Sequence, residues 1–225
     1  MAGQILQRPQ ATRATVLYQD AAVIIIDKPA GVAVSRGREG LPSVEDWLEE
    51  LRRGKRHLPQ PAHRLDAETA GCLALGRTKP AMAALGALFA GRAVEKTYWA
   101  VVVGGPQAAA GMIDAPLLKV SSKAAGWRMV VDPRGQPALT RWRVLGRGEG
   151  LAWLELTPET GRTHQLRVHC TTQGFPILGD AMYGTAHPGG LHLLARRLAF
   201  TLETRIEAEA PVPAAMRPAL ARCGG

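Results

Sequence analysis

The chain alternates short apolar runs with turns that are rich in glycine and proline. β-Branched and aliphatic residues dominate four runs in its first half, and such runs predict strands. These runs are residues 14–18, 23–27, 71–77 and 96–103. Further strand candidates follow one another in the second half without a helical pattern between them. They cover residues 112–118, 127–132, 137–145 and 151–157. Consecutive strands of this kind favour an antiparallel sheet.

Three segments carry helix signals instead. Each combines a capping residue with a later glycine that would end the helix, and the first also has apolar side chains at helical spacing. The expected caps and ends are Ser43 and Gly54, Thr78 and Gly91, and Thr163 and Gly174. For the third segment a strand is the weaker alternative.

The two ends of the chain lack such patterns. Residues 1–13 are predicted to be a loosely ordered leader, and they lack the apolar block of a signal peptide. Residues 210–225 are rich in proline and alanine and are expected to wrap the surface. The 225 residues are 46% hydrophobic, which is enough for a sizeable core. We therefore predict one domain over residues 14–225.

The net charge of the chain indicates which class of partner it binds. The chain has 28 lysines and arginines against 19 acidic residues, a formal net charge of +9. Its pI is near 10.1, and a pI above about 9 is typical of nucleic-acid binding. The alternative is a basic soluble protein without such a partner.

Cysteine usage and hydropathy bear on the compartment. The three cysteines form no CxxC pair, which argues against a disulfide scaffold or a zinc ribbon. No apolar run approaches the length of a membrane span. We therefore expect a cytoplasmic protein that does not enter a membrane.

One dense charged stretch stands directly before an apolar run. His63, Arg64 and Asp66 place two cations and a carboxylate within four positions. A carboxylate held at the rim of a core beside cations is a candidate nucleophile or acid–base group. An ordinary Arg–Asp pair on the surface is the alternative.

A basic cluster precedes this stretch, and we call it the 52–56 cluster. It consists of Arg52, Arg53, Lys55 and Arg56. Two interpretations stay open: a solvated helix end, where cations suit the helix dipole, or a rim that contacts phosphates.

Residues 159–169 form a second dense stretch. Arg167 is its strongest candidate, because a planar guanidinium can hold a carboxylate bidentately and keep it ionised. His164 and His169 are five positions apart and face different ways on a helix or a strand. They are therefore poor joint ligands, and no metal site is predicted.

Several motifs, in order and at matching spacing, resemble those of the RluA-type pseudouridine synthases over roughly residues 15–215. They are Val16-Leu17-Tyr18-Gln19-Asp20, Asp27-Lys28-Pro29-Ala30-Gly31, His63-Arg64-Leu65-Asp66 with Thr69 and Gly71, Lys96-Thr97-Tyr98, Gly161-Arg162-Thr163-His164-Gln165-Leu166-Arg167-Val168-His169 and Gly179-Asp180-Ala181-Met182-Tyr183-Gly184. The resemblance implies an α+β fold with a mixed, largely antiparallel central sheet, flanking helices and the site in a cleft. It also implies isomerisation of uridine to pseudouridine in rRNA, tRNA or both, without a cofactor.

The resemblance also implies roles for single residues. Asp66 matches the catalytic aspartate, and Tyr98 matches a tyrosine that stacks on the uracil and could accept the proton from C5. Arg167 matches the arginine that pairs with the aspartate. Arg64 matches an arginine that can fill the gap left by a flipped nucleotide, and Leu166 matches an aliphatic residue of the base pocket.

Further candidates and alternatives complete the sequence-based hypothesis. His63, Arg162 and the 52–56 cluster are added as candidate RNA contacts. Ala70 departs from the family, where serine is common, and the chain lacks room for an extra S4-type RNA-binding domain. We expect a monomer that binds RNA through its catalytic domain. The alternatives are a nucleoside- or glycoside-cleaving hydrolase that uses Asp66 and Glu68, and a catalytically silent RNA-binding module.

Overall fold

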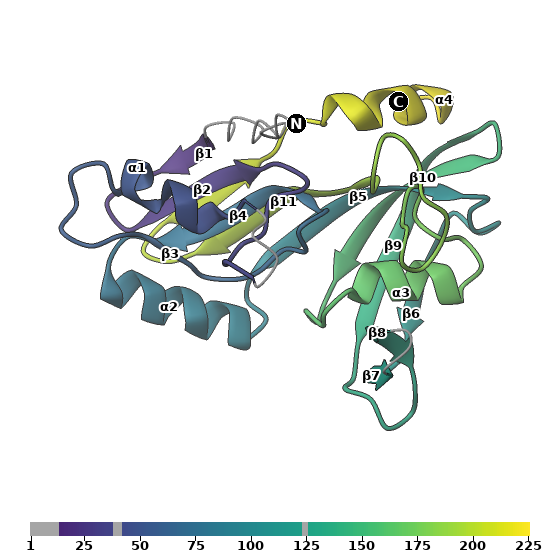
Figure 1. The fold of residues 1–225 in the computed structure, drawn as a ribbon, viewed down its shortest axis with the longest axis horizontal. Helices are drawn as coiled ribbons and strands as arrows, with labels where there is room; N and C mark the ends of the chain where they lie inside the picture. The colour runs from purple at the N-terminus through teal and green to yellow at the C-terminus, as the bar shows by residue number, and fades with distance from the viewer. Residues whose placement is uncertain (1–13, 38–41, 123–125) are drawn as a thin grey trace, which may run out of the picture.

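A computed structural model describes residues 14–37, 42–122 and 126–225 (Figure 1). The expected leader, residues 1–13, lies outside the described residues. The strands are β1 (Thr15–Gln19), β2 (Val23–Lys28), β3 (Gln60–Pro61), β4 (Ala70–Gly76), β5 (Glu95–Val103), β6 (Ala110–Asp114), β7 (Leu117–Ser122), β8 (Gly126–Val131), β9 (Leu139–Gly148), β10 (Leu151–Pro158), β11 (Leu193–Thr201) and β12 (Arg205–Glu209). The helices are the 3-10 turns η1 (Val44–Trp47) and η2 (Ala214–Met216), and α1 (Leu48–Arg52), α2 (Lys79–Ala90), α3 (Gln165–Thr172) and α4 (Arg217–Arg222).

Within the described residues, ten of the strands form one sheet. Its main order is β1-β2-β4-β11-β5-β10-β9-β6, with β3 beside β4 and β12 beside β11. The pair of β4 and β11 is parallel, and the other neighbours run antiparallel. The predicted α+β fold with a mixed, largely antiparallel sheet and flanking helices is therefore confirmed.

Two strands of the N-terminal part of the chain, β2 and β4, are buried on both faces. Every residue of β4 is buried, as are Val23 to Ile26 of β2. One face of these strands packs against Trp47 and Leu51, and the other packs against Leu85 of α2. Burial of both faces explains why these strands appear in the sequence as continuous apolar runs.

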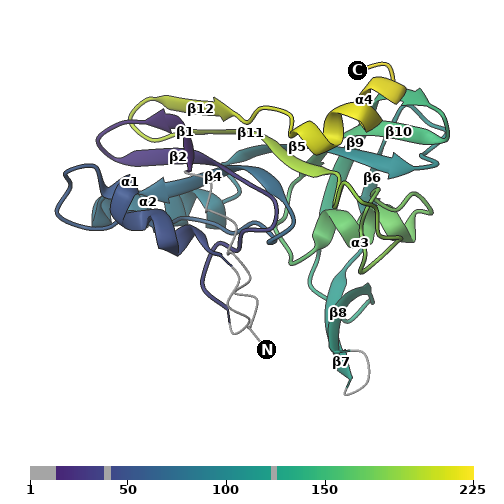
Figure 2. The ribbon, with the colours of Figure 1, turned by 45° about the horizontal axis from the view of Figure 1, so that its top comes forward.

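The C-terminal half carries α3 against the sheet (Figure 1). Leu166 and Cys170 of this helix pack on Leu154 and Leu156 of β10. The separate hairpin of β7 and β8 extends away from this half of the molecule (Figure 2).

Some predicted elements were wrong. The single strand expected over 112–118 is two strands, because the chain leaves the main sheet at Pro116, which has no N–H to donate to a ladder. The expected cap Thr163 is also wrong, since His164 occupies the N-cap position with a left-handed φ of 52°.

The C-terminal part differs from expectation too. The sequence analysis did not predict β11 and β12. The tail does not merely wrap the surface, since Met216 and Leu220 are buried in a cluster with Phe200 and Ile206.

Candidate active site

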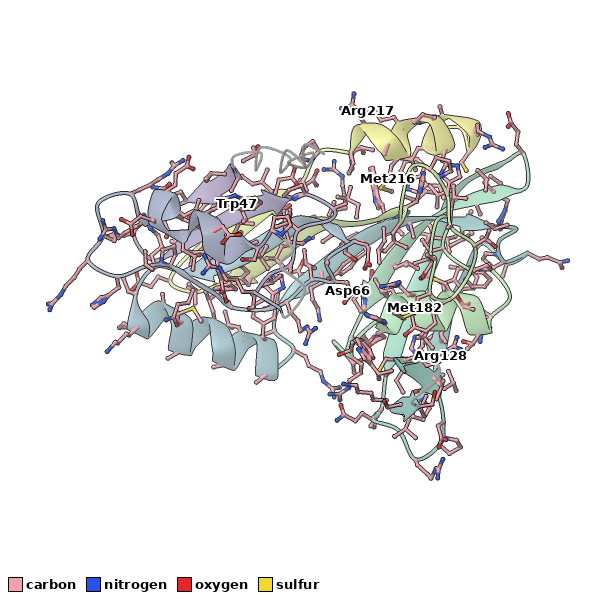
Figure 3. The ribbon with its side chains drawn as sticks, in the orientation of Figure 1. Trp47, Asp66, Arg128, Met182, Met216 and Arg217 are labelled. Atoms are coloured by element: carbon pink, nitrogen blue, oxygen red, sulfur yellow. The ribbon has the colours of Figure 1, made fainter. Side chains whose placement is uncertain are left out.

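Asp66 lies in the loop between β3 and β4, where the two halves of the sheet meet (Figure 3). The loop is anchored by Leu65, which is buried in the core. A turn follows at once, in which the Thr69 N–H donates to the Asp66 carbonyl oxygen at 3.1 Å. The Asp66 carboxylate itself keeps 16% of its side-chain surface exposed, so it is shielded but reachable.

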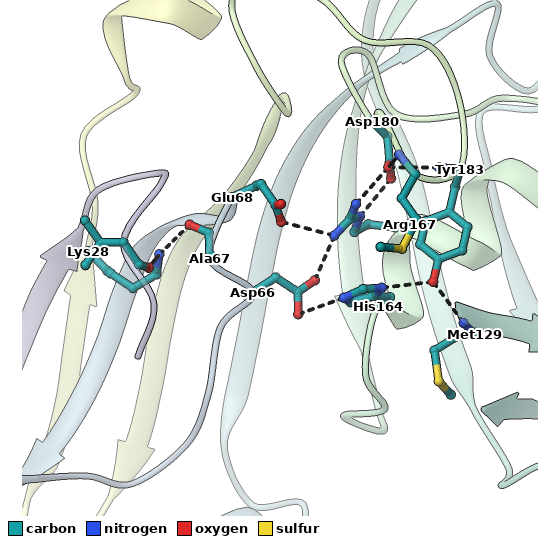
Figure 4. Close-up of polar contacts among 11 residues, drawn as sticks. Lys28, Asp66, Ala67, Glu68, Met129, His164, Arg167, Asp180 and Tyr183 are labelled. Atoms are coloured by element: carbon teal, nitrogen blue, oxygen red, sulfur yellow. Dashed lines mark hydrogen bonds and ion pairs between the residues drawn. The ribbon is translucent and has the colours of Figure 1, made fainter. Parts of the chain in front are cut away.

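A buried lysine holds this loop from the N-terminal side. The ammonium group of Lys28 donates to the carbonyl oxygens of Pro29, Val32 and Ala67 at 2.9, 2.7 and 3.1 Å (Figure 4). Burial lowers the pKa of Lys28 to about 8, although the nearby carboxylates oppose that shift. The bond to Ala67 ties the residue that follows Asp66 to the end of β2.

A close approach of two backbones fixes the other end of the loop. Gly71 has a φ of +112°, and a Cβ built there would lie 2.3 Å from the carbonyl oxygen of Ala195. Only glycine tolerates both this conformation and this close contact. Gly71 therefore fixes the register of β4 against its parallel neighbour β11.

Arg167 projects from α3 toward Asp66 and is almost fully buried. Its Nε and Nη2 atoms donate to the two carboxylate oxygens of Asp180, both at 2.8 Å. Its Nη1 atom lies 3.5 Å from Asp66 Oδ2 and 3.3 Å from Glu68 Oε2 (Figure 4). The bidentate partner is therefore Asp180, while Asp66 receives one longer contact.

Asp180 is fully buried and has several donors. Besides Arg167, the backbone N–H groups of Met182 and Tyr183 donate to its Oδ1 atom at 3.0 and 3.1 Å. Burial alone would raise the pKa of Asp180, but Arg167 and these two N–H groups lower it overall. The ion pair fixes the Arg167 guanidinium, so its third nitrogen points at Asp66.

Two cavities meet at Asp66. The first has a volume of about 470 Å³. It brings together most of the candidates from the sequence, namely His63, Arg64, Asp66, Tyr98, Arg162, Leu166 and Arg167. The second, of about 750 Å³, shares Arg64, Asp66 and Arg167 and adds Trp127 and Met182.

Tyr98 of β5 lines the first cavity. Burial, and then the negative charge of Asp66, raise the pKa of its hydroxyl far above the ordinary value. The phenol therefore stays protonated near neutral pH. A protonated phenol accepts a proton only while it releases its own, so it could act as a relay but not as a free phenolate base.

His63 lines both cavities but makes structural contacts. Its Nε2 atom accepts from the Ala74 N–H at 3.0 Å, and its ring stacks on Phe89 with centroids 4.6 Å apart. Burial lowers the pKa of His63 to about 4, so it carries no positive charge for a phosphate at neutral pH.

The 52–56 cluster lies away from both cavities, and none of its residues lines either one. It sits at the far end of β4, since Arg77, which follows that strand, donates to the Arg52 carbonyl oxygen at 3.4 Å. Seven strand residues span about 20 Å. The cluster is therefore separated from Asp66 by roughly the length of one strand.

The sequence analysis assigned no role to Asp180, although a signal was available. Asp180 is the one acidic residue between positions 165 and 190, and the helix that carries Arg167 is otherwise buried. A buried arginine needs a carboxylate, and Asp180 is the first acidic residue that follows Arg167 in the chain. Over the described residues, no group of three His, Cys, Asp or Glu side chains could hold a metal ion.

Comparisons with known proteins identify related sequences and a related fold. The family model described as RNA pseudouridylate synthase matches residues 22–172. An uncharacterized RNA pseudouridine synthase of Zymomonas mobilis is 43% identical over 206 residues, covering 89% of this chain and 94% of that protein. Ribosomal large subunit pseudouridine synthase C of Vibrio cholerae is 34% identical over 219 residues, covering 92% of this chain and 68% of that protein.

A solved structure shows the same architecture. Human RNA Pseudouridylate Synthase Domain Containing 4 superposes with a TM-score of 0.78 at 29% identity, covering 93% of each chain. Sequence and fold lead to one assignment. The chain belongs to the RluA-type family of RNA pseudouridine synthases, which are isomerases that convert uridine in RNA to pseudouridine.

Proposed function

We propose that Asp66 is the catalytic residue of this isomerase and that the first cavity receives the target uracil. The supporting observation is its position: among the described residues, Asp66 is the carboxylate that lines both cavities. Arg167, 3.5 Å away, keeps it paired with a positive charge without a direct bidentate bond. A carboxylate held in this way has a cation beside it and is still reachable by a ribose carbon.

The reaction breaks the N1–C1′ bond, turns the uracil and joins C5 to C1′. Asp66 acts on the ribose, as a nucleophile at C1′ or as a base at C2′; addition at C6 of the uracil is a further route. The detached uracil turns between the Tyr98 ring and the apolar side chain of Leu166, which both line the first cavity. A proton then leaves C5, with Tyr98 as relay. No step in this scheme consumes a cofactor.

The uridine must leave its stack before it reaches Asp66, at a cost of a few kcal/mol that is lowest in a loop or bulge. Arg64 is exposed and lines both cavities. It can fill the gap left by the flipped nucleotide or contact a phosphate. Arg162, at the first cavity, is a second candidate phosphate contact.

We propose ribosomal RNA as the main substrate, with tRNA as the alternative. The name of the Vibrio cholerae relative, a ribosomal large subunit pseudouridine synthase, supports this choice. We further propose that the enzyme acts as a cytoplasmic monomer. Its three cysteines are free and buried, which suits a reducing compartment. None of the described helices is long and apolar enough to cross a membrane.

Product analysis tests the chemistry. Purified protein is incubated with uridine-containing RNA, and free uracil and pseudouridine are quantified. Pseudouridine supports the proposal, whereas free uracil would indicate hydrolysis by Asp66 and Glu68, and no change would indicate a silent RNA-binding module. Pseudouridine mapping of cellular RNA from a strain without this protein then identifies the target uridine.

A further inference from the structure

His164 and Arg167 approach different oxygens of the Asp66 carboxylate. The His164 Nε2 atom is 3.8 Å from Asp66 Oδ1, whereas Arg167 approaches Oδ2 (Figure 4). The His164 side chain is only 9% exposed. Its backbone adopts a φ of 52°, a left-handed conformation that costs energy in a residue other than glycine. Such a conformation persists only where surrounding contacts hold it.

The surrounding contacts set the position of the imidazole proton. The Tyr183 hydroxyl lies 3.0 Å from the Met129 backbone nitrogen, which can only donate, and 2.9 Å from His164 Nδ1. The hydroxyl therefore accepts from Met129, and donating its single proton to Nδ1 is the arrangement that leaves neither that proton nor Nδ1 without a partner. Nδ1 is then the acceptor, and the proton of a neutral His164 sits on Nε2, facing Asp66.

The neutral form is the one to expect. Four charged groups face His164: Asp66, Glu68, Arg167 and Asp180. Burial and the Arg167 cation lower its pKa, and together they outweigh the three carboxylates, which raise it.

The β7–β8 hairpin holds the same imidazole from a second direction. The Trp127 ring of β8 lies with its centroid 5.0 Å from that of His164, tilted by 35°. The Lys119 ammonium of β7 lies 4.7 Å from the Trp127 centroid. Met129, whose N–H fixes the Tyr183 hydroxyl, is also in β8. His164 is thus held on two sides by one hairpin.

We propose that His164 is a positioning residue for the catalytic carboxylate: its Nε2–H restrains one oxygen of Asp66 while Arg167 restrains the other. This inference rests on the proposed catalytic role of Asp66. At 3.8 Å the contact is longer than a hydrogen bond, so a shift of somewhat less than 1 Å closes it when substrate enters. The two contacts together fix the plane of the carboxylate relative to the ribose. The hairpin therefore takes part in aligning the catalytic centre.

The first test reads the tautomer directly in the unaltered enzyme. Protein labelled with ¹⁵N in histidine is examined by long-range ¹⁵N–¹H correlation at pH 7, and the His164 signals are assigned by their loss in His164→Gln. The proposal predicts a proton on Nε2 and none on Nδ1. Tyr183→Phe removes the hydroxyl that donates to Nδ1, so the Nδ1 signal should move toward that of an unbonded, unprotonated ring nitrogen while the proton stays on Nε2. A proton on Nδ1 in the unaltered enzyme would overturn the proposal.

The second test uses two amide side chains. Glutamine places an N–H the same number of bonds from Cα as His164 Nε2, whereas the asparagine amide reaches only as far as Nδ1. Asparagine also tolerates the left-handed backbone. Misplacement by about 1 Å costs on the order of 10²-fold, so His164→Asn should lower kcat by about that factor. The KM for RNA should stay within about threefold, because the contact serves alignment rather than binding.

His164→Gln should keep most of kcat. Equal loss in both variants, or no loss in either, would overturn the positioning role. Thermal melting shows whether His164→Asn folds; if it does not, the tautomer measurement still decides. The activity of Asp66→Asn separates failure of the proposed catalytic role of Asp66 from failure of the positioning role of His164. If Asp66→Asn is active, the proposed catalytic role of Asp66 is wrong. If Asp66→Asn is inactive and both His164 variants keep the wild-type kcat, only the positioning role of His164 is wrong.

Discussion

Asp180, and not Asp66, is the carboxylate that holds Arg167 through two hydrogen bonds, each 2.8 Å long. This division gives the arginine two tasks. One side of the guanidinium is fixed in the protein, and the remaining nitrogen faces the proposed catalytic carboxylate at 3.5 Å. Asp66 is thereby held beside a fixed positive charge by a single contact, and its oxygens are not taken up by a bidentate bond.

The Arg167–Asp180 pair should be essential for stability. Asp180→Asn leaves a buried guanidinium without its anionic partner, and breaking a buried pair costs about 3–5 kcal/mol. Urea denaturation measures this loss. Glu155→Gln is the matched control, because Glu155 pairs with Arg143 at 2.8 Å on the surface and such pairs contribute about 0–1 kcal/mol. Similar losses in the two variants would contradict the central place given to this pair.

Tyr98→Phe should separate binding from proton transfer. The ring that stacks on the uracil remains, so RNA affinity should be unchanged. Loss of the relay hydroxyl should slow release of the C5 proton by about 10²–10⁴-fold, the usual contribution of a positioned acid or base. The assay is tritium release from RNA labelled at uracil C5. Trp99→Phe is the control, since Trp99 packs on Trp153 and does not line the cavities. Wild-type release by Tyr98→Phe would remove the relay role and leave stacking.

Lys28 should give stability a distinct pH dependence. Its pKa is about 8 in the folded protein, below the ordinary 10.5. Between these values the unfolded chain binds a proton that the folded protein has released, so the Lys28 contribution to stability rises with pH. Over the whole range between the two pKa values, the Lys28 contribution to the free energy of unfolding changes by about 3 kcal/mol. The unfolding free energy of the wild type minus that of Lys28→Met should therefore increase from pH 7 to pH 10.5.

Lys79→Met provides the comparison, because Lys79 is exposed at the start of α2. Its difference from wild type should stay nearly constant over the same range. If the Lys28→Met and wild-type curves run parallel, the pKa of Lys28 is not depressed and the account of this buried ammonium is wrong.

Salt dependence should distinguish the cavity cations from the 52–56 cluster. Arg64→Ala should flatten the slope of log affinity against log salt by about 0.7–0.9 for each phosphate that Arg64 neutralises in the wild type. This should hold for a short stem–loop that carries the target uridine. Replacing the whole cluster with alanine should change the slope only for a longer RNA, because the cluster lies roughly one strand length, about 20 Å, from Asp66. An unchanged slope with long RNA would assign the cluster to the solvated surface.

Elements with strong local signals could be predicted from the sequence. The Thr78 hydroxyl accepts from the Ala81 N–H at 3.2 Å, and Gly91 ends the helix that it caps, as expected. By contrast β11 was missed, because Arg196 and Arg197 interrupt its apolar pattern. Their partners, Glu209 and Glu95, come from other parts of the chain, so the strand is stabilised by contacts that no local pattern reveals.

In the candidate site, too, some residues could be predicted from the sequence and others could not. The motif resemblance was enough to expect Asp66, Tyr98 and Arg167 together, and the structure places all three at one cavity. The supporting contacts depend on the path of the loop after α3. That path brings Asp180 to Arg167, whereas the sequence shows only that Asp180 is the first acidic residue after Arg167. The left-handed His164 likewise reflects tertiary contacts, which override the capping signal of Thr163.

Tritium release by Asp66→Asn is the most direct test of the central claim, that this carboxylate performs the chemistry. The substitution keeps the size of the side chain and removes its charge, so RNA affinity should stay within about tenfold. Release of tritium from C5-labelled RNA should be abolished, because neither nucleophilic attack nor proton removal at the ribose is open to an amide. Substantial release by Asp66→Asn, at normal affinity, would contradict the account.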